Sequence, residues 1–259
     1  MTGDRISPIF LGKTLMPDVV EGFGITQNKL GAVRAVGFDL DGTLFDHRGS
    51  ATDGVRVFLQ NLGADPSVRA LDLWFAAEDA EFEHWRAGRI SFQEQRRRRL
   101  RSVLTALNVE FDDEPTALDL LFEQYLREYR QAWRPFPDAI DVLLSLRARG
   151  LRLGLLTNGN EEQQLTKLEV IGLTEHFDVV CISEAIGVQK PDVGAFYSLA
   201  RLLDVEPRQC LFIGDNPEHD IDGATETGMR AALIERYRVG AGGLSAVIER
   251  ALASAGDAR

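Results

Sequence analysis

Cysteine is scarce in this chain of 259 residues, which contains only Cys181 and Cys210. Two cysteines are too few for a disulfide framework, and both stand in apolar runs, so we expect buried, reduced thiols. Long apolar segments are also lacking, because no run approaches the roughly 18 residues of a membrane-spanning helix. Residues 1–15 lack the charged segment followed by an apolar block that is typical of a secretion signal. We therefore expect a cytoplasmic protein with no membrane partner.

Positive charge is in short supply as well. The sequence has 29 basic against 40 acidic residues and a formal net charge of −11. This balance argues against a nucleic-acid partner, which would require a basic face. Only four of the basic residues are lysines, and the other 25 are arginines. Hydrophobic residues make up 44% of the chain, which is enough for a sizeable core and excludes disorder for most of the sequence.

Apolar runs of strand length alternate with helical patterns in two parts of the chain. The first run ends abruptly at Asp39, and the alternation resumes near Phe136. A helical pattern over 139–149, closed by Gly150, is typical of the segments between the runs. The order predicts an α/β fold, a Rossmann-like parallel sheet with helices on both faces. The expected strands cover residues 32–38, 151–156, 179–182, 210–213 and 231–234.

The segment 49–134 interrupts this alternation and contains no convincing strand. Its apolar residues recur at intervals of three and four, as they do in amphipathic helices, and they form four helical patterns. We therefore expect an all-helical module inserted after the first strand of the core. The predicted organisation is an irregular N-terminal extension at 1–31, an α/β core at 32–48 and 135–259, and the helical insertion at 49–134.

Two acidic residues, Asp39 and Asp41, follow the first expected strand, and Gly42 comes next. This spacing brings two carboxylates to one edge of the sheet, where open α/β folds bind their ligands. The glycine permits a sharp turn after them. A pair of turn aspartates with no catalytic role is the alternative interpretation.

Three more polar motifs follow later strands. The sequence Thr-Asn-Gly at 157–159 offers a hydroxyl and backbone N–H groups that suit phosphate oxygens. Lys190 is one of only four lysines, so a compact ammonium group at this point is a less random choice than an arginine. Asp215 and Asp220 follow another apolar run. A solvated lysine is the alternative for Lys190, and an acidic helix N-cap is the alternative for Asp215 and Asp220.

Together these motifs resemble the haloacid dehalogenase-like (HAD) superfamily, in its phosphatase branch with a helical cap inserted after the first core strand. The matching residues are the sequence DLDGT at 39–43, Thr157, Lys190 and the acids within 214–220, in the family's order. Connecting residues such as Lys167 also resemble this branch. The resemblance covers the core and the position of the cap, but not residues 1–31.

The resemblance implies a role for each acid. Asp39 would be the nucleophile that attacks phosphorus and forms an aspartyl-phosphate. Asp41 would protonate the leaving alcohol and then deprotonate the attacking water. Mg²⁺ would be the cofactor, held by the carboxylates of Asp39 and Asp215 and by the backbone carbonyl of Asp41. Asp220 would hold metal-bound waters or orient Lys190.

The remaining motif residues would hold the phosphate. Thr157 and the backbone at Asn158 and Gly159 would contact phosphate oxygens, and Lys190 would neutralise the crowd of carboxylates and phosphate. These groups would supply the positioning and charge stabilisation that phosphoryl transfer demands.

Gly88 interrupts the helical pattern of the insertion. In capped relatives such a bend often faces the catalytic acids, so the neighbouring side chains are candidate substrate contacts. A plain turn between two helices is the alternative. The run of four arginines at 96–99 cannot form one patch on a helix, and we expect it to be a solvated face. The candidate substrate contacts are His84, Trp85, Arg86 and Arg89.

The expected function is that of a Mg²⁺-dependent phosphatase acting on a small phosphorylated metabolite, of the nucleotide, sugar phosphate or phosphoglycolate type. A sugar phosphomutase of the same family is the first alternative. A 2-haloacid dehalogenase is the second, although that branch lacks an acid at the position of Asp41. A phospho-acceptor domain without catalysis is the third, although such domains lack the DxDGT turn and the helical insertion.

Overall fold

The structure is a computed structural model that describes residues 33–253. The irregular extension expected at 1–31 and the first residue of the expected strand at 32–38 lie outside the described residues. The chain divides into two compact units. The core unit contains the described residues up to Asp46 and from Arg134 onward, and the helical unit is the segment His47–Trp133.

The core unit is built on a five-stranded sheet in the order β3-β2-β1-β4-β5. All neighbouring strands pair in parallel, so the α/β class expected from the sequence is confirmed. β1 is central, and its last residue, Phe38, stands opposite Leu155 of β2 and Ile213 of β4. The strands are β1 Ala35–Phe38, β2 Arg152–Thr157, β3 Val179–Ile182, β4 Cys210–Gly214 and β5 Arg230–Leu233.

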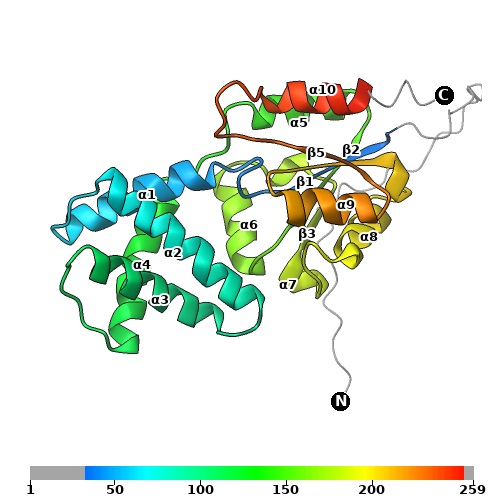
Figure 1. The fold of residues 1–259 in the computed structure, drawn as a ribbon. Helices are drawn as coiled ribbons and strands as arrows, with labels where there is room; N and C mark the ends of the chain where they lie inside the picture. Colours follow the sequence, from blue (N-terminus) through cyan, green and yellow to red (C-terminus); the bar gives the residue numbers. More distant parts are fainter. Residues whose placement is uncertain (1–32, 254–259) are drawn as a thin grey trace, which may run out of the picture. The chain divides into compact units, whose positions relative to one another are not determined.

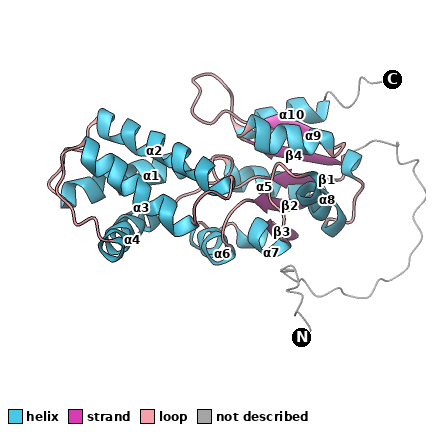
Figure 2. Cartoon of the chain, turned by 60° about the horizontal axis from the view of Figure 1, so that its bottom comes forward, coloured by secondary structure: helices cyan, strands magenta, loops and turns pink. Residues whose placement is uncertain are grey.

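Helices cover the two faces of this sheet. In Figure 1, α5 (Ala139–Ala148) and α10 (Leu244–Ala253) lie above the sheet in contact with each other, and α8 (Val193–Leu202) and α9 (Gly223–Glu226) lie below it. The strands that separate these helices are drawn in magenta in Figure 2. The other helical segments of the core are α6 Glu161–Val170, α7 Ser183–Ile186 and short turns at Thr174–His176, Pro207–Gln209 and Pro217–Asp222.

Burial of apolar side chains between α8 and the sheet holds the lower layer. Phe196 of α8 packs edge-on against Phe212 of β4, with ring centroids 5.1 Å apart. Cys181 and Cys210 belong to the same buried cluster, and both are free thiols, as expected. Burial raises the pKa of each thiol to about 12, so neither is a reactive thiolate.

The helical unit consists of four helices: α1 (His47–Asn61), α2 (Val68–Arg86), α3 (Phe92–Ala106) and α4 (Pro115–Gln131). An aromatic cluster fills its centre, where the ring centroid of Trp74 lies 4.4 Å from that of Tyr125 and 5.9 Å from that of Phe58. Among residues 33–253, no helix is long and apolar enough to cross a membrane.

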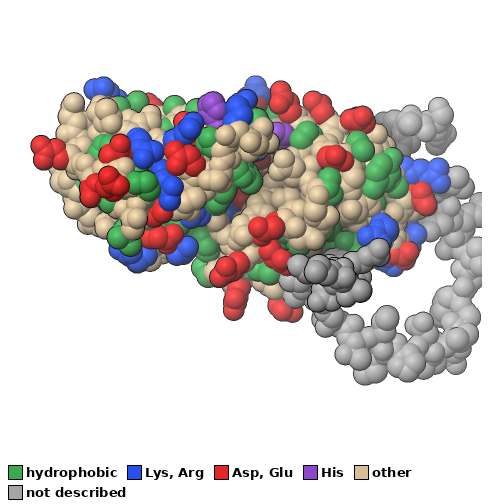
Figure 3. Space-filling view, turned by 90° about the horizontal axis from the view of Figure 1, so that it is seen from below, with side chains coloured by type: hydrophobic (Ala, Val, Ile, Leu, Met, Phe, Trp, Pro, Cys, Tyr) green, Lys and Arg blue, Asp and Glu red, His purple; other side chains and the backbone are tan. Residues whose placement is uncertain are grey.

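The expectation of a solvated face at 96–99 is wrong for Arg99. Its side chain is only 4% exposed, lies 3.2 Å from Glu78, and stands 5.1 Å from the ring of Trp74. Successive helix positions point about 100° apart, so four consecutive arginines cannot all face water. Arg97, by contrast, pairs with Asp119 nearer the surface. Acidic and basic side chains are interspersed on the face drawn in Figure 3.

Candidate active site

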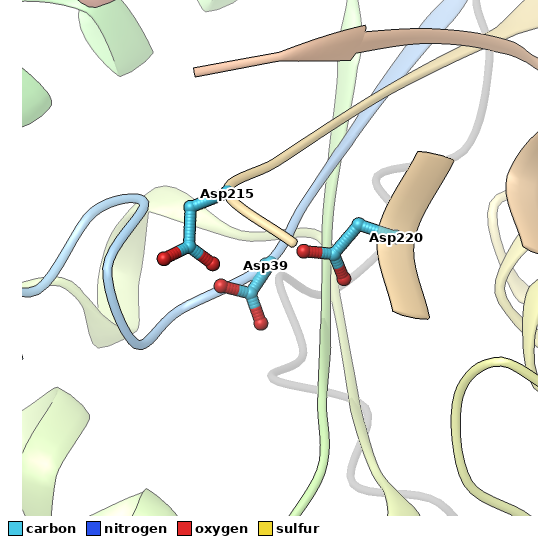
Figure 4. A group of neighbouring side chains, drawn as sticks. All are labelled: Asp39, Asp215 and Asp220. Atoms are coloured by element: carbon cyan, nitrogen blue, oxygen red, sulfur yellow. The ribbon is translucent and has the colours of Figure 1, made fainter. Parts of the chain in front are cut away.

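Three carboxylates from the carboxyl edge of the sheet converge in the core unit. Asp39 follows β1, Asp215 follows β4, and Asp220 lies in the helical turn Pro217–Asp222. Because β1 and β4 are adjacent and parallel, their carboxyl ends meet at the same edge. One oxygen from each of the three side chains lies within 4.8 Å of the others. Figure 4 shows Asp39 between Asp215 and Asp220.

Lys190 neutralises part of this negative charge. Its Nζ donates to Asp39 Oδ1 at 2.7 Å and to Asp220 Oδ1 at 2.6 Å, and its side chain is 4% exposed. Burial alone would lower the pKa of the ammonium group, but attraction to the two carboxylates outweighs burial and raises that pKa. Lys190 is therefore a fixed cation at the centre of the site.

The remaining negative charge is poorly compensated. Burial, with repulsion from Asp220, raises the pKa of Asp39 to about 7 despite the attraction of Lys190. Removal from water and repulsion by Asp39 and Asp220 raise the pKa of Asp215 to about 8. Asp215 is exposed at the surface, so repulsion by the neighbouring carboxylates contributes more to this shift than removal from water does. One ammonium group, that of Lys190, is not enough to offset the charge of three neighbouring carboxylates.

A divalent cation fits this arrangement. The converging ligand atoms are carboxylate oxygens, which Mg²⁺ prefers, and a cation would offset the repulsion that raises both pKa values. Two glycines make the convergence possible. A Cβ on Gly42, whose φ is +88°, would overlap the Asp215 carboxylate, and one on Gly214 would overlap the Asp220 carboxylate. A side chain at either position would therefore displace one of the converging acids.

The Asp39 carboxylate is held at both oxygens. Lys190 binds Oδ1, and the buried Thr43 donates its hydroxyl to Oδ2 at 2.9 Å. Arg236 holds Thr43 in turn, because its Nε and Nη2 donate to the Thr43 carbonyl at 2.9 and 2.7 Å. Nη1 of the same guanidinium binds both oxygens of Asp138. The nucleophile expected from the sequence thus has a fixed orientation.

The Asp41 carboxylate points to partners other than the three acids. Lys167 Nζ donates to Oδ1 at 2.5 Å, and Gln164 Nε2 donates to Oδ2 at 2.9 Å. Asp41 is therefore separate from the carboxylate cluster, and only its backbone carbonyl remains for the metal role expected from the sequence. The partnership with Lys167 and Gln164 was not anticipated.

Thr157 is the last residue of β2, the strand that pairs with β1, and Asn158 follows it. Thr157 is buried at the end of the strand, and its Oγ1 accepts a hydrogen bond from Gln164 at 2.8 Å. The Asn158 side chain bonds both backbone groups of Lys190, each at 2.9 Å, so it fixes the segment that carries the lysine. The Gly159 N–H donates to Ser183 Oγ at 2.9 Å. Phosphate binding by 157–159 stays a prediction.

The candidate substrate contacts Trp85, Arg86 and Arg89 lie in the helical unit, not among the core residues above. Trp85 packs edge-on against Phe82 and Phe92, with centroids 5.8 and 5.1 Å apart. Arg86 pairs with Glu83 at 2.6 Å. Arg89 donates to His84 Nδ1 at 3.0 Å. Their role toward a substrate also stays a prediction.

The edge of the parallel sheet thus holds a cluster of three carboxylates, a further acid with its own partners, a buried lysine and a threonine hydroxyl. This combination is typical of a hydrolase site. Residues 33–228 match the family model of haloacid dehalogenase-like hydrolases. The chain belongs to this family.

Several curated proteins resemble the chain. A glyceraldehyde 3-phosphate phosphatase of Methanopyrus kandleri is 41% identical over 40% of this chain and 44% of its own length. A phosphoserine phosphatase of Thermus thermophilus is 40% identical over 45% of this chain and 46% of its own. The chain thus matches less than half the length of these two proteins. A pyrimidine 5′-nucleotidase of Escherichia coli is 32% identical over 77% of this chain and 85% of its own.

Solved structures share the fold. A HAD-hydrolase from Bacillus subtilis, bound to magnesium, superposes with a TM-score of 0.67 at 22% identity. The match covers 78% of this chain and 87% of that protein. It supports the fold described above.

Proposed function

We propose that this protein is a Mg²⁺-dependent phosphatase that hydrolyses a small phosphorylated metabolite through an aspartyl-phosphate on Asp39. The observation that carries the proposal is the pairing of two aspartates with different surroundings. Asp39 lies in the carboxylate cluster beside Lys190, and Asp41 lies outside it, held by Lys167 and Gln164. Two carboxyl groups in separate environments suit two roles, a nucleophile and an acid/base.

In the first half-reaction, a carboxylate oxygen of Asp39 attacks phosphorus and the bond from phosphorus to the ester oxygen breaks. Asp41 donates a proton to the departing alkoxide, which leaves as an alcohol. Lys190 stabilises the charge on the transferring group, and the Thr157 hydroxyl binds a phosphate oxygen. The product is a mixed anhydride between Asp39 and phosphate.

In the second half-reaction, Asp41 is already a carboxylate and accepts a proton from a water molecule. This water attacks phosphorus, the bond between phosphorus and Asp39 breaks, and inorganic phosphate is released. Asp41 ends protonated and Asp39 ends as a carboxylate, so the cycle can begin again. Bound Mg²⁺, held by Asp39, Asp215 and the Asp41 carbonyl with Asp220 nearby, would supply further positive charge at the phosphate.

The substrate that this proposal favours is a small phosphate monoester. The named activities of three relatives concern a triose phosphate, a phosphoamino acid and pyrimidine nucleotides, and all three are small. We assign the helical unit the role of a cap that contributes substrate contacts through Trp85, Arg86 and Arg89. Differences among these side chains would then select the alcohol part of the ester.

The test is release of inorganic phosphate by the purified protein from a panel of small esters. The panel contains phosphoglycolate, glyceraldehyde 3-phosphate, phosphoserine, sugar phosphates and pyrimidine nucleotides. We expect turnover of at least one ester, loss of activity in EDTA and recovery with Mg²⁺. An Asp39→Asn preparation, purified in the same way, measures contaminating phosphatases.

Two results would contradict the proposal. One is undiminished activity after exhaustive dialysis against EDTA, which would remove the metal from the reaction. The other is interconversion of sugar phosphates with no release of inorganic phosphate, which would identify a mutase.

A further inference from the structure

Helix α6 brings two buried polar side chains to the Asp41 carboxylate. Gln164 and Lys167 stand three positions apart and therefore share one face of the helix. They are 3% and 2% exposed. A lysine and a glutamine are seldom buried to this degree without a partner, and here Asp41 is a partner of both.

Lys167 holds one oxygen of Asp41. Its Nζ lies 2.5 Å from Oδ1 and 4.7 Å from the centre of the Phe45 ring. A hydrogen bond between two charged groups is short and strong, and the ring face adds attraction for the cation. Asp41 itself is 31% exposed, so a ligand or a water molecule can reach its carboxylate while Oδ1 stays bound.

Gln164 connects the other oxygen of Asp41 to Thr157. Its Nε2 lies 2.9 Å from Asp41 Oδ2 and 2.8 Å from Thr157 Oγ1. When an amide N–H donates to a hydroxyl oxygen, that hydroxyl uses an acceptor lone pair and keeps its own hydrogen for another partner. In this structure the Thr157 hydroxyl donates to the Asn158 carbonyl at a long 3.5 Å, so a phosphate oxygen could accept this hydrogen in its place.

We propose that Gln164 and Lys167 are positioning residues of the reaction and form a clamp on Asp41. Lys167 fixes the carboxylate for proton transfer to and from the ester oxygen and water. Gln164 fixes the same carboxylate and also directs the Thr157 hydroxyl toward the phosphate. This inference rests on the proposed phosphatase function and assigns separate tasks to the two residues.

Positioning of this kind has a large effect on rate. A displacement of about 1 Å at a reacting group can cost ~100-fold, and general acid–base catalysis is worth ~10²–10⁴-fold. Loss of the clamp should therefore slow the two steps that need Asp41, which are release of an alkyl alcohol and attack by water. It should spare the transfer of phosphate from a phenyl ester to Asp39. An ester with a phenol leaving group needs little help from an acid, and an alkyl ester needs much.

Three variants test the proposal. Lys167→Met keeps a long side chain over Phe45 but removes the ammonium group. Gln164→Met keeps the length of the glutamine but removes its amide. Gln163→Met is the matched control, because Gln163 is the residue before Gln164 on α6. Its backbone N–H donates a cap hydrogen bond to Asn160, and the substitution leaves this bond in place. Thermal unfolding of each variant establishes that the fold is retained.

For Lys167→Met, we expect kcat/KM on an alkyl phosphate to fall by about 100-fold. We expect kcat/KM on 4-nitrophenyl phosphate to stay within about 5-fold of wild type, because its phenol leaves without a proton. Dephosphorylation still needs a base, so a burst of one phenol per enzyme should precede slow turnover. Gln163→Met should match wild type on both esters.

Beryllium fluoride, which mimics a phosphoryl group on a carboxylate, separates the two residues. With Mg²⁺ present, its affinity should be unchanged in Lys167→Met, because the task proposed for that lysine is to hold Asp41 and not Thr157. In Gln164→Met the affinity should fall by about 10-fold, because the Thr157 hydroxyl is no longer held in the orientation that suits a phosphate oxygen.

Equal losses on both esters, without a burst, would overturn the clamp while leaving the phosphatase function in place. Kinetics like those of the wild type in Lys167→Met and Gln164→Met would also overturn the clamp. A wild-type protein that releases phosphate from no ester would instead overturn the phosphatase function, and the clamp with it. The wild-type measurement therefore distinguishes the two failures.

Discussion

Stabilisation of the folded protein by Mg²⁺ should increase steeply with pH between 6 and 8. The pKa values of Asp39 and Asp215 are raised to about 7 and 8. A carboxyl group whose pKa is raised on folding lowers stability as pH rises from its ordinary value of about 4 to the raised value, because the unfolded chain gives up its proton first. In the absence of metal, these two groups therefore lower stability progressively as pH rises toward 8.

Mg²⁺ reverses this trend because it binds the ionised carboxylates. At pH 6 the ion must displace protons from both groups, and at pH 8 it meets far fewer. Each displaced proton changes apparent affinity by up to ~10-fold per pH unit, so the gain from pH 6 to pH 8 is on the order of 10²–10³-fold. We take the lower end because Asp215 is exposed, and water screens its charge.

A 100-fold gain in affinity corresponds to about 3 kcal/mol of added stability, provided that Mg²⁺ is well above its Kd at both pH values. For a protein of this size, the rise in Tm that Mg²⁺ causes should be roughly 5–10 °C larger at pH 8 than at pH 6. The assay is thermal unfolding at pH 6, 7 and 8, with and without excess Mg²⁺. Asp215→Asn should flatten the dependence, and the exposed Asp222→Asn is the control that should leave it unchanged.

A shift of Tm by Mg²⁺ that is the same at pH 6 and pH 8 would refute this reasoning, because it would mean that Asp39 and Asp215 do not exchange protons for the ion in this range. A dependence lost equally in Asp222→Asn and Asp215→Asn would show that general surface charge, not the cluster, binds the ion.

Four further results should follow from the site. Asp39→Asn should lower kcat by at least ~10³-fold, measured by phosphate release, because it removes the attacking oxygen charge; near wild-type kcat would require another nucleophile. Its Tm without Mg²⁺ should not fall, since a crowded carboxylate does not stabilise the fold. Asp41→Asn should fail almost completely on an alkyl phosphate but give a phenol burst on 4-nitrophenyl phosphate; equal losses without a burst would exclude Asp41 as acid/base. Ca²⁺ should replace Mg²⁺ poorly in the same assay, because its looser coordination misplaces Asp39.

The sequence predicted the sheet and the convergence of its acids because both depend on local patterns. Apolar runs bounded by polar residues are typical of parallel strands, and the residue after each strand must lie at the carboxyl edge. Asp39 and Asp215 were therefore placed together without knowledge of the strand order. Strand ends were less well predicted, since β1 begins at Ala35, three residues later than expected.

The partners of Asp41 were missed although a signal was present. The scarcity of lysine that singled out Lys190 applies equally to Lys167. Its position with Gln164 on one face of the helix after β2 could have placed both near the carboxyl edge. That Lys167 binds Asp41 depends on the distance across the site, and no spacing in the sequence encodes it.

Burial of charge was the least predictable feature. Arg99 follows three other arginines, and composition alone places all four in water. The structure buries Arg99 against Trp74 and Glu78, because the helix must turn one of the four toward the aromatic core. A neighbouring glutamate and an aromatic ring on another helix decide that outcome, and neither is visible in the run itself.

Trapping the phosphorylated nucleophile tests the central claim most directly. In Asp41→Asn supplied with Mg²⁺ and 4-nitrophenyl phosphate, the phosphoryl group should accumulate on Asp39 after the burst. Borohydride reduces an acyl phosphate to an alcohol, so peptide mass spectrometry of the treated protein should find residue 39 with its carboxyl group replaced by a hydroxymethyl group. Reduction at a different aspartate, or an unreduced residue 39 in protein that has released a burst of phenol, would contradict the account.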